Sequence, residues 1–479
     1  MPTDPAYDAT IIGSGPNGLA AAITLARAGL SVLVVEAKET VGGGSRSAQL
    51  TLPGFTHDIC SAIHPLGIGS PFFRNLPLHE HGLEWIEPPT PLAHPFDDGT
   101  AVVCERSITA TATERNLGVD AHAYRRIMQP LVRDWPLVED FFLGPLRIPQ
   151  PFQPIALARF GIPALLPVRT LAQIAFKEER ARALLAGMAA HSMLPLEKVA
   201  TSAIALVLSI LAHSVGWPMA KGGSQAIADA MASYLRSLGG EIITGMKVDT
   251  LDQLPRSRAV LFDVTPRQMV KIAGKRLPAS YTRRLSRFRY GPGVFKLDYA
   301  LDGPVPWRAE ECSRAATVHV GGTLAEIALS ERDQSHGRHS ERPYVIVAQQ
   351  SLFDSTRAPV GKHTLWAYCH VPNGSTFDMT ERIEAQIERF APGFRDLILA
   401  RHTMSPADFQ AYNPNYIGGD INGGAQDILQ IYTRPLPQLV PYKTANPRLF
   451  ICSASTPPGG GVHGMGGYFA ARAALRELW

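Results

Sequence analysis

Apolar and polar positions near the start of the chain follow a strand pattern, then a helix pattern, then a strand pattern again. Residues 10–12 are a short β-branched run, and residues 19–28 repeat apolar positions at helical spacing. Gly29 follows that segment, at the place where a left-handed residue commonly ends a helix. Residues 31–35 form a second β-branched run, which Glu36 closes. The pattern predicts a strand, a glycine turn, a helix and a second strand.

The turn between the first strand and the helix has the spacing G-x-G-x-x-G, in the order Gly13-Ser14-Gly15-Pro16-Asn17-Gly18. We expect Gly13 to permit a tight turn, Gly15 to let backbone approach a pyrophosphate, and Gly18 to let helix and strand pack closely. Free N–H groups and the positive dipole end at the helix start favour phosphates. Glu36 is placed to bind a ribose, and an acid at this position argues against the 2′-phosphate of NADP. The sequence therefore predicts a dinucleotide site on a Rossmann-type sheet.

Glycines are concentrated at two further places. Residues 42–46 read Gly-Gly-Gly-Ser-Arg, which would bring backbone and a cation toward the far end of a long cofactor. Residues 448–453 have a strand pattern, and a glycine-rich run from Gly459 to Gly467 then precedes the last helical segment. Close approach of backbone to another group requires such glycines. We expect the N–H groups of this last helix to lie beside the redox-active end of the same cofactor.

The middle of the chain becomes apolar between residues 149 and 218. Residues 199–219 carry no charge across 21 positions, which is long enough to cross the hydrocarbon of a membrane. Polar residues such as Ser209 and His213 dilute this segment, and no long basic run flanks it. A buried helix that lines an apolar cavity is the preferred interpretation, and a membrane-spanning helix is the alternative.

The remaining pattern predicts a second sheet and an interrupted cofactor domain. We expect a polar, exposed insertion at residues 325–342. The expected domains are residues 1–90 with 219–290 and 440–479 for the cofactor, and residues 91–218 with 291–439 for the substrate. Helices are expected at residues 225–238 and 380–391, and strands at 241–248, 259–264, 297–301, 317–320, 344–348 and 364–370.

Composition narrows the classes of function. The net charge is only +4 over 479 residues, and there is no basic run interleaved with aromatic residues, so we expect no nucleic-acid partner. The five cysteines are scattered and form no C-x-x-C, which excludes a redox-disulfide motif, and no cysteine–histidine cluster has the spacing of a metal site. The first ten residues lack the features of a signal peptide, so a cytoplasmic protein is expected.

Several stretches together resemble one family. They are GSGPNGLAAA, GGGSRS, PMAKGGSQAIADAMASYLRSLGGEIITGMKV, GKHTLWAYCHVPNG, PNYIGGDINGGA and STPPGGGVHGM. These motifs resemble the phytoene-desaturase-like FAD oxidoreductases, within the superfamily that shares the monoamine-oxidase type of flavin fold. The resemblance covers nearly the whole chain and points to a branch of uncertain substrate, because the loop PPGGGVHGM departs from that of the carotene desaturases. It implies an α/β fold, with a Rossmann-type FAD-binding domain and an interleaved α+β substrate-binding domain.

The resemblance also implies non-covalent FAD and the residues that bind it. Val248 would place its backbone at the adenine, and Ser455, Gly464 and Met465 would lie near the ribityl chain and the flavin. The full set of predicted cofactor-binding residues is Gly13, Ser14, Gly15, Pro16, Asn17, Gly18, Glu36, Ala37, Gly43, Gly44, Ser45, Arg46, Val248, Ser455, Gly464 and Met465.

Candidate acid or base groups are less constrained. His463 is the first candidate because the glycine run should hold it near the flavin, and its alternative is a structural histidine that bonds to backbone. His64 is the second candidate, while Tyr416 and Tyr468 are weaker ones that more often serve packing.

The expected function is hydride transfer between an apolar substrate, isoprenoid or lipid-like, and flavin N5, in desaturation, saturation or isomerisation. Oxygen or a quinone is the expected electron acceptor, because there is no second complete G-x-G-x-x-G unit. Peripheral membrane contact is left open for the apolar region. The alternatives are a non-catalytic flavin-binding protein for assembly or redox sensing, and an amine oxidase.

Overall fold

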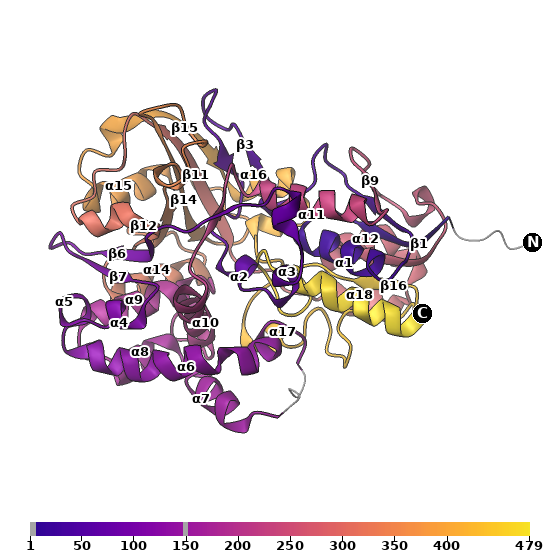
Figure 1. Cartoon of the computed structure of the whole chain (residues 1–479), viewed down its shortest axis with the longest axis horizontal. Coiled ribbons are helices and arrows are strands. Elements are labelled where there is room, and N and C mark those ends of the chain that lie inside the picture. The colour runs from indigo at the N-terminus through magenta and orange to yellow at the C-terminus, as the bar shows by residue number, and fades with distance from the viewer. Residues whose placement is uncertain (1–5, 147–151) are drawn as a thin grey trace, which may run out of the picture.

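The computed structural model describes residues 6–146 and 152–479, so residues 149–151 of the predicted apolar region lie outside it. Two sheets organise these residues, one of five strands and one of seven (Figure 1). Two short two-stranded sheets, β3 (Ser47–Ala48) with β4 (His57–Asp58) and β5 (Trp85–Ile86) with β8 (Met219–Ala220), lie in the connections. The predicted α/β class is confirmed.

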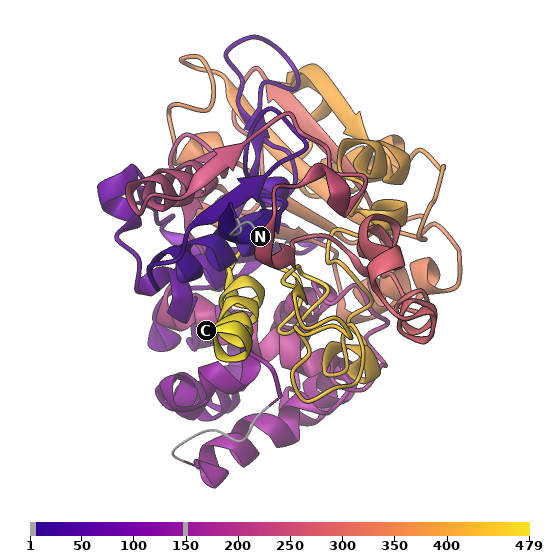
Figure 2. The same cartoon turned by 90° about the vertical axis from the view of Figure 1, so that its right-hand side faces the viewer.

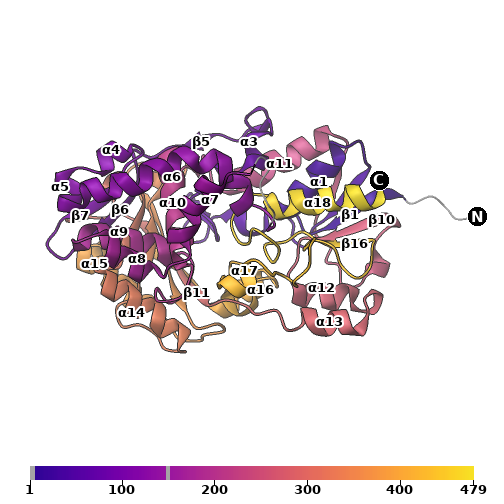
Figure 3. The same cartoon turned by 90° about the horizontal axis from the view of Figure 1, so that it is seen from below.

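The five-stranded sheet is parallel throughout, in the order β16-β10-β1-β2-β9. Both of its faces are buried, because alternate residues enter different cores: Val32 and Val34 pack on one side, and Leu33 and Val35 on the other. Helices α1, α11 and α18 cover the first face and α12 and α13 the second (Figure 3). The bounds are β1 (Tyr7–Ile12), β2 (Val32–Val35), β9 (Glu241–Ile243), β10 (Ser257–Phe262), β16 (Leu449–Ile451), α1 (Pro16–Ala26), α11 (Gln225–Ser237), α12 (Pro266–Ala273), α13 (Ala279–Leu285) and α18 (Met465–Leu478).

Helices α1 and α18, from opposite ends of the chain, pack against each other with almost no space between their backbones. A Cβ added at Gly467 would lie 1.8 Å from the Asn17 carbonyl oxygen. The amide of Gly467 donates to the side-chain oxygen of Asn17 at 3.3 Å. Figure 2 shows α18 beside the strands of the parallel sheet. The glycines at the second helix start therefore permit helix–helix contact.

The seven-stranded sheet has the order β15-β11-β14-β13-β12-β6-β7 and is antiparallel except for the β12–β6 pair. Its faces alternate in the same way: on β14, Ala367 and Cys369 enter a core with α15 (Thr380–Phe390), whereas Trp366 and Tyr368 face the other side. Its strands come from the ranges predicted for the substrate domain, except for Thr90 at the boundary; the domain division itself stays a prediction. The bounds are β6 (Thr90–Pro95), β7 (Ala101–Cys104), β11 (Gly293–Leu301), β12 (Ala315–Val320), β13 (Val345–Ala348), β14 (His363–Val371) and β15 (Ile398–Met404).

Most helices between residues 108 and 214 gather below the seven-stranded sheet (Figures 1 and 3). Helix α10 is buried along most of its length, as preferred from the sequence, and Leu208 lines a cavity. Within the described residues no single helix is both long and apolar enough to cross a membrane; α7 and α8 pass that test only jointly, with a 103° bend between them. The bounds are α4 (Ile108–Thr111), α5 (Glu114–Leu117), α6 (Ala121–Phe142), α7 (Pro154–Ala164), α8 (Val168–Ala175), α9 (Glu179–Ala190) and α10 (Thr201–Ser214).

Two predicted elements differ from the structure: the strand predicted at residues 241–248 ends at Ile243, and the polar insertion is wrong. Residues 325–342, expected to be an exposed polar insertion, contain most of helix α14 (Leu324–Ser335). Ile327 and Ala328 are fully buried, and Thr323 with Glu326 forms a capping box at the helix start. The apolar face is too narrow to stand out from the polar residues around it. The remaining helices are α2 (Pro65–Ile68), α3 (Pro71–Arg74), α16 (Pro406–Tyr412) and α17 (Ile428–Ile431).

Candidate cofactor and substrate site

A cavity of about 410 Å³ begins at the carboxyl ends of β1, β2 and β10 and continues toward the seven-stranded sheet. Ligands of open parallel sheets bind at this edge, and the volume falls within the range of small-molecule sites, roughly 300–1,000 Å³. Charged groups lie at the sheet edge, where Glu36, Arg46 and Asp263 line the cavity. Aromatic and aliphatic side chains line the other end. The cavity is therefore polar at one end and apolar at the other.

The first glycine turn has the geometry predicted for it. Gly13 has a φ of +97°, which a residue with a side chain rarely adopts. A Cβ at Gly18 would lie 2.1 Å from the Gly13 carbonyl oxygen, so strand and helix pack closely only because residue 18 is glycine. Gly15 lines the cavity with its backbone. These positions leave the start of α1 open to a phosphate group.

Glu36 lies at the centre of a polar network at the end of β2. One carboxylate oxygen accepts from the Ser14 amide at 2.9 Å and the Ser14 hydroxyl at 2.6 Å. The other oxygen accepts from the Lys38 amide at 2.9 Å and pairs with the Arg46 guanidinium at 3.0 Å. Only 6% of Glu36 is exposed, so its orientation is fixed before any ligand binds.

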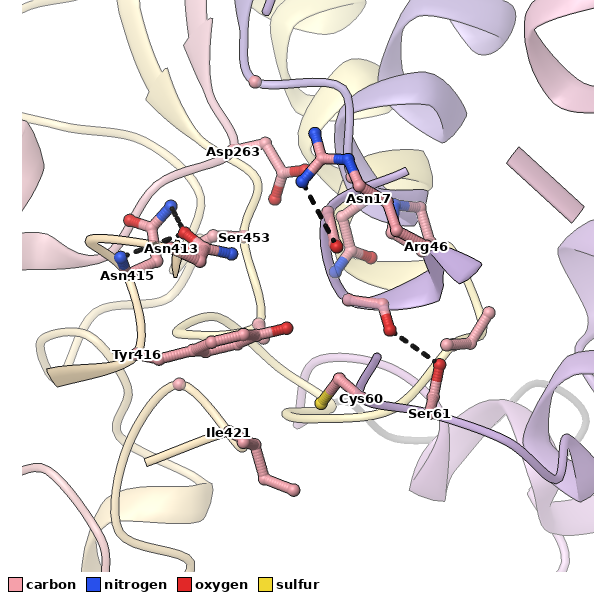
Figure 4. Close-up of a pocket in the computed structure, with 18 of the residues that line it drawn as sticks. Asn17, Arg46, Cys60, Ser61, Asp263, Asn413, Asn415, Tyr416, Ile421 and Ser453 are labelled. Atoms are coloured by element: carbon pink, nitrogen blue, oxygen red, sulfur yellow. Dashed lines mark hydrogen bonds between the residues drawn. The ribbon is translucent and has the colours of Figure 1, made fainter. Parts of the chain in front are cut away.

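The second glycine turn faces a wall formed by the segment that follows α16. A Cβ at Gly44 would lie 2.5 Å from the Tyr416 hydroxyl, and one at Gly43 would lie 3.0 Å from the Gly15 Cα. Tyr416 and Asn413 lie across the pocket from Arg46 and Cys60 (Figure 4). A side chain at Gly43 would therefore press on the first turn, and one at Gly44 would overlap Tyr416, so both glycines permit close packing around the cavity.

Most predicted cofactor residues meet in this one cavity. Gly18 and Ser45 lie behind it and shape the two turns, whereas Gly464 and Met465 lie elsewhere. The predicted residues that line the cavity are Gly13, Ser14, Gly15, Pro16, Asn17, Glu36, Ala37, Gly43, Gly44, Arg46, Val248 and Ser455.

Gly464 and Met465, predicted to lie near the flavin, are not among the residues that line the described cavity. A Cβ at Gly464 would meet Phe72 at 2.8 Å and Ala20 at 3.0 Å, which places this glycine in a packed interior. The Met465 amide donates to Nδ1 of His463 at 3.0 Å. The residues of this loop that reach the cavity are Gly461 and Val462. The sequence pattern misleads here because helix packing and ligand binding need the same residue type.

His463 is a structural histidine. With Nδ1 accepting from Met465, its proton lies on Nε2, which donates to the Gly459 carbonyl at 3.2 Å. The side chain is buried, and burial lowers the pKa of His463 to about 4. Both ring nitrogens are thus engaged within its own loop, and it does not line the described cavity. These contacts are those expected of the structural alternative, and the described cavity gives no support for a catalytic role of His463.

His64 does line the cavity. Its Nε2 lies 2.8 Å from the Ser224 hydroxyl, which itself donates to the Ser61 carbonyl at 2.7 Å. Because Ser224 has one proton and uses it on Ser61, His64 must donate from Nε2, which leaves Nδ1 unprotonated. Burial lowers the pKa of His64 to about 4, so the ring is neutral at pH 7. His64 presents an acceptor nitrogen and keeps its place as a candidate.

Asp263 is a site residue that the sequence analysis missed. It follows β10, and its carboxylate accepts from the Gly18 amide at 2.9 Å, at the start of α1. Burial raises the pKa of Asp263 to about 7. The sequence does show an acid at the end of a predicted strand, and the carboxyl ends of neighbouring parallel strands meet at one edge of a sheet. The sequence does not show the order of the strands, which is what brings Asp263 next to the first glycine turn.

The apolar end of the cavity joins residues far apart in the sequence. Trp366 and Tyr368 project from β14, with ring centroids 4.9 Å apart at 74°. Ile346 on β13 lies on the same wall, and Leu208 and Trp217 come from the helical side. Within the described lining this end has no carboxylate, so it suits an apolar ligand.

Comparison with known proteins shows which proteins this chain resembles. A family model for an NAD(P)-binding Rossmann-like domain matches residues 11–75. Over 99% of its length the chain is 26% identical to pyridine nucleotide-disulfide oxidoreductase domain-containing protein 2 of Rattus norvegicus, covering 94% of that protein. It is 23% identical to a subunit of limonene dehydrogenase from Castellaniella defragrans, over 98% of the chain and 95% of the relative. It is 24% identical to 4,4'-diapolycopene oxygenase of a Methylomonas species, over 94% of each.

Solved structures share the fold. An oxidoreductase from Methanosarcina mazei superposes with a TM-score of 0.67 at 15% identity, over 98% of this chain and 99% of the other. Cyclohexylamine oxidase from Brevibacterium oxydans gives 0.59 at 17% identity, over 99% of each. With the relatives, this likeness supports an enzyme of the FAD-type oxidoreductase superfamily that carries a Rossmann-like nucleotide-binding domain.

Proposed function

We propose that this enzyme of the FAD-type oxidoreductase superfamily transfers a hydride between an apolar substrate, isoprenoid or lipid-like, and non-covalently bound FAD. The observation that carries the proposal is the continuity of one cavity from the glycine turns and Glu36 to Trp366 and Ile346. The polar end of the cavity suits a nucleotide, and the apolar end suits an apolar carbon skeleton. The phytoene-desaturase-like motifs and the relatives named for limonene and diapolycopene support the same substrate class.

The residues of the chain supply binding, orientation and exclusion of water. Glu36 and Val248 would hold the adenosine part of FAD, and the start of α1 would hold its pyrophosphate. Arg46 and Ser455 would hold the ribityl and flavin part. When bound, FAD would supply a flavin ring that exchanges a hydride at N5. Trp217, Trp366 and Ile346 keep the substrate end apolar, and His64 offers an unprotonated nitrogen that can accept a substrate proton.

Anaerobic absorbance spectroscopy of the purified protein tests this proposal. We expect an alkene such as limonene to change the redox state of the flavin within one turnover, either directly or, for saturation, after the flavin has been reduced with dithionite. Amines and hydroxylated compounds are tested in parallel. A flavin that responds to amines alone would contradict the proposal, and so would a protein without flavin.

Amine oxidation is the second candidate, because two aromatic rings of the cavity, Trp366 and Tyr368, lie on one strand and could contact an amine. The rings meet edge to face, however, and so fill space against each other instead of flanking a ligand. A protein that holds flavin but responds to none of the compounds would instead fit the non-catalytic alternative, assembly or redox sensing.

We predict that cofactor affinity falls as pH rises through about 7. Asp263 lies where the pyrophosphate would bind, and burial raises its pKa to about 7, so the carboxyl is neutral below that pH and repels phosphate above it. Asp263→Asn keeps an acceptor for the Gly18 amide without the charge. Its FAD dissociation constant, measured by fluorescence titration, should be flat between pH 6 and pH 8. A wild-type constant that is equally flat would remove Asp263 from the phosphate site.

We propose oxygen or a quinone as the electron acceptor, and rapid reduction of the flavin by NADPH in stopped-flow experiments would overturn this.

We also propose peripheral contact of this otherwise cytoplasmic protein with a lipid surface. Helices α7 and α8 carry three strongly exposed apolar residues: Ile155 is 72% exposed, Ile162 69% and Ile174 74%. Replacing all three with aspartate should abolish co-sedimentation with phosphatidylcholine vesicles, and equal binding by this variant would refute the contact.

A further inference from the structure

Two histidines, one partly exposed and one fully buried, meet at the apolar end of the cavity. His191 follows α9, and its Nε2 lies 2.9 Å from Nε2 of His319 on β12. His191 lines the cavity and is partly exposed to it, whereas His319 is fully buried behind it. Trp217 packs edge-on against both rings. This pair has no part in the cofactor site described above.

The pair shares one proton between its facing nitrogens. Burial lowers the pKa of His191 to about 3 and that of His319 well below its usual value, so both rings are neutral. Each neutral ring carries one N–H, and in a hydrogen bond between two Nε2 atoms one ring donates and the other accepts. The direction of this bond decides which group His191 offers to the cavity.

The surroundings of His319 fix that direction. Its Nδ1 is buried and has no hydrogen-bond partner among the described residues. A Cβ at Gly187 would lie only 2.6 Å from this nitrogen, so Nδ1 faces the backbone of α9 at a residue without a side chain. The Gly187 carbonyl already accepts from the Tyr344 hydroxyl at 2.8 Å. A buried N–H without an acceptor is more costly than a lone pair beside a Cα–H group, so the proton of His319 lies on Nε2.

It follows that His319 donates to His191, and that His191 carries its own proton on Nδ1. Among the described residues this Nδ1 has no partner, so it is free to donate to a ligand. A neutral imidazole N–H in an apolar cavity selects a hydrogen-bond acceptor.

We propose that His191, held in the Nδ1–H tautomer by His319, donates a hydrogen bond to an oxygen of the substrate. The substrate is then an apolar skeleton that carries a carbonyl or hydroxyl oxygen, and His319 is a positioning residue. This inference rests on the proposed function in one respect, that this end of the cavity receives the substrate.

Two probes that differ by one carbonyl oxygen test the hydrogen bond: limonene, and carvone, the ketone of the same skeleton. Calorimetric titration of the holoenzyme gives both dissociation constants. We expect His191→Leu to weaken carvone binding about two- to tenfold, the range for loss of one neutral hydrogen bond, and to leave limonene binding unchanged or tighter. His191→Gln, which keeps an N–H, should retain part of the affinity for carvone, and a leucine at the exposed His79 should change neither constant.

A second measurement reports the tautomer directly. In the ¹⁵N spectrum of histidine-labelled holoenzyme, the signals lost in His191→Leu should belong to a ring with protonated Nδ1 and unprotonated Nε2. In His319→Leu the remaining His191 signals should lose this fixed pattern. A wild-type His191 protonated on Nε2, or on both nitrogens, would overturn the proposal whatever the variants bind.

The possible results distinguish failure of the His191 hydrogen bond from failure of the proposed function. If His191→Leu weakens both probes equally, or neither, the hydrogen bond is refuted while the apolar substrate site stands. If neither probe binds wild-type holoenzyme, both this inference and the proposed substrate class fail.

Discussion

Gly467→Ala should lower the thermal stability of the protein and release most of its cofactor. A methyl group at this position would overlap the Asn17 carbonyl, because the Cβ would lie 1.8 Å from that oxygen, and the contact is backbone that no rotamer change can relieve. Overpacking of this kind costs about 1–3 kcal/mol and in rigid places more. Since Asn17 lines the phosphate end of the cavity, displacement of α18 also displaces the glycine turn. The melting temperature, and the flavin content after gel filtration, measure both effects.

The matched control is Gly161→Ala within α7. Among the described residues no neighbouring atom lies within 4 Å of a Cβ at this position, and alanine favours a helix over glycine by about 0.5–1 kcal/mol. This variant should melt at or above the wild-type temperature and keep its cofactor. If Gly467→Ala behaved like Gly161→Ala, the close crossing of α1 and α18 would be wrong.

Glu36→Ala should weaken FAD binding by about 10- to 100-fold, which is the range for losing a hydrogen bond to a charged acceptor, about 1.5–3 kcal/mol. Two effects act together. The ribose loses its acceptor, and the buried Arg46, 3.0 Å away, loses its ion-pair partner. Fluorescence titration of the FAD-free protein gives the dissociation constants.

Glu39→Ala is the control, because this carboxylate is exposed and lies only three residues further along the same loop. It should bind FAD as the wild type does. Equal affinities for wild type, Glu36→Ala and Glu39→Ala would mean that the ribose binds elsewhere.

The nucleotide end of the site could be predicted because its signal is local. The turn from Gly13 to Gly18 and the acid Glu36 lie within one strand–helix–strand unit. The turn has the geometry that its spacing indicates, and Glu36 lines the same end of the cavity. The apolar end could not be predicted in the same way. Trp366, Tyr368 and His191 line one cavity only because segments far apart in the sequence fold together, and nothing near any of them in the sequence marks this.

His463 shows a different limit of prediction from the sequence. A histidine within a glycine run has the same appearance in sequence whether it faces a ligand or bonds to its own loop. Only the Met465 amide and the Gly459 carbonyl, which occupy its two nitrogens, decide between these roles. His64, with no glycine run around it, is the histidine of the two that reaches the cavity.

Identification of the released cofactor tests the central claim most directly. The proposal requires FAD at the cavity that begins at Gly13 and Glu36, and a polypeptide without a covalent flavin. Acid precipitation of the purified protein, followed by chromatography of the supernatant and mass spectrometry of the pellet, decides both points. We predict close to one FAD per chain in the supernatant and an unmodified chain mass in the pellet. A yellow pellet with an added flavin mass would contradict non-covalent binding, and a supernatant that contains NAD or NADP in place of FAD would contradict the account itself.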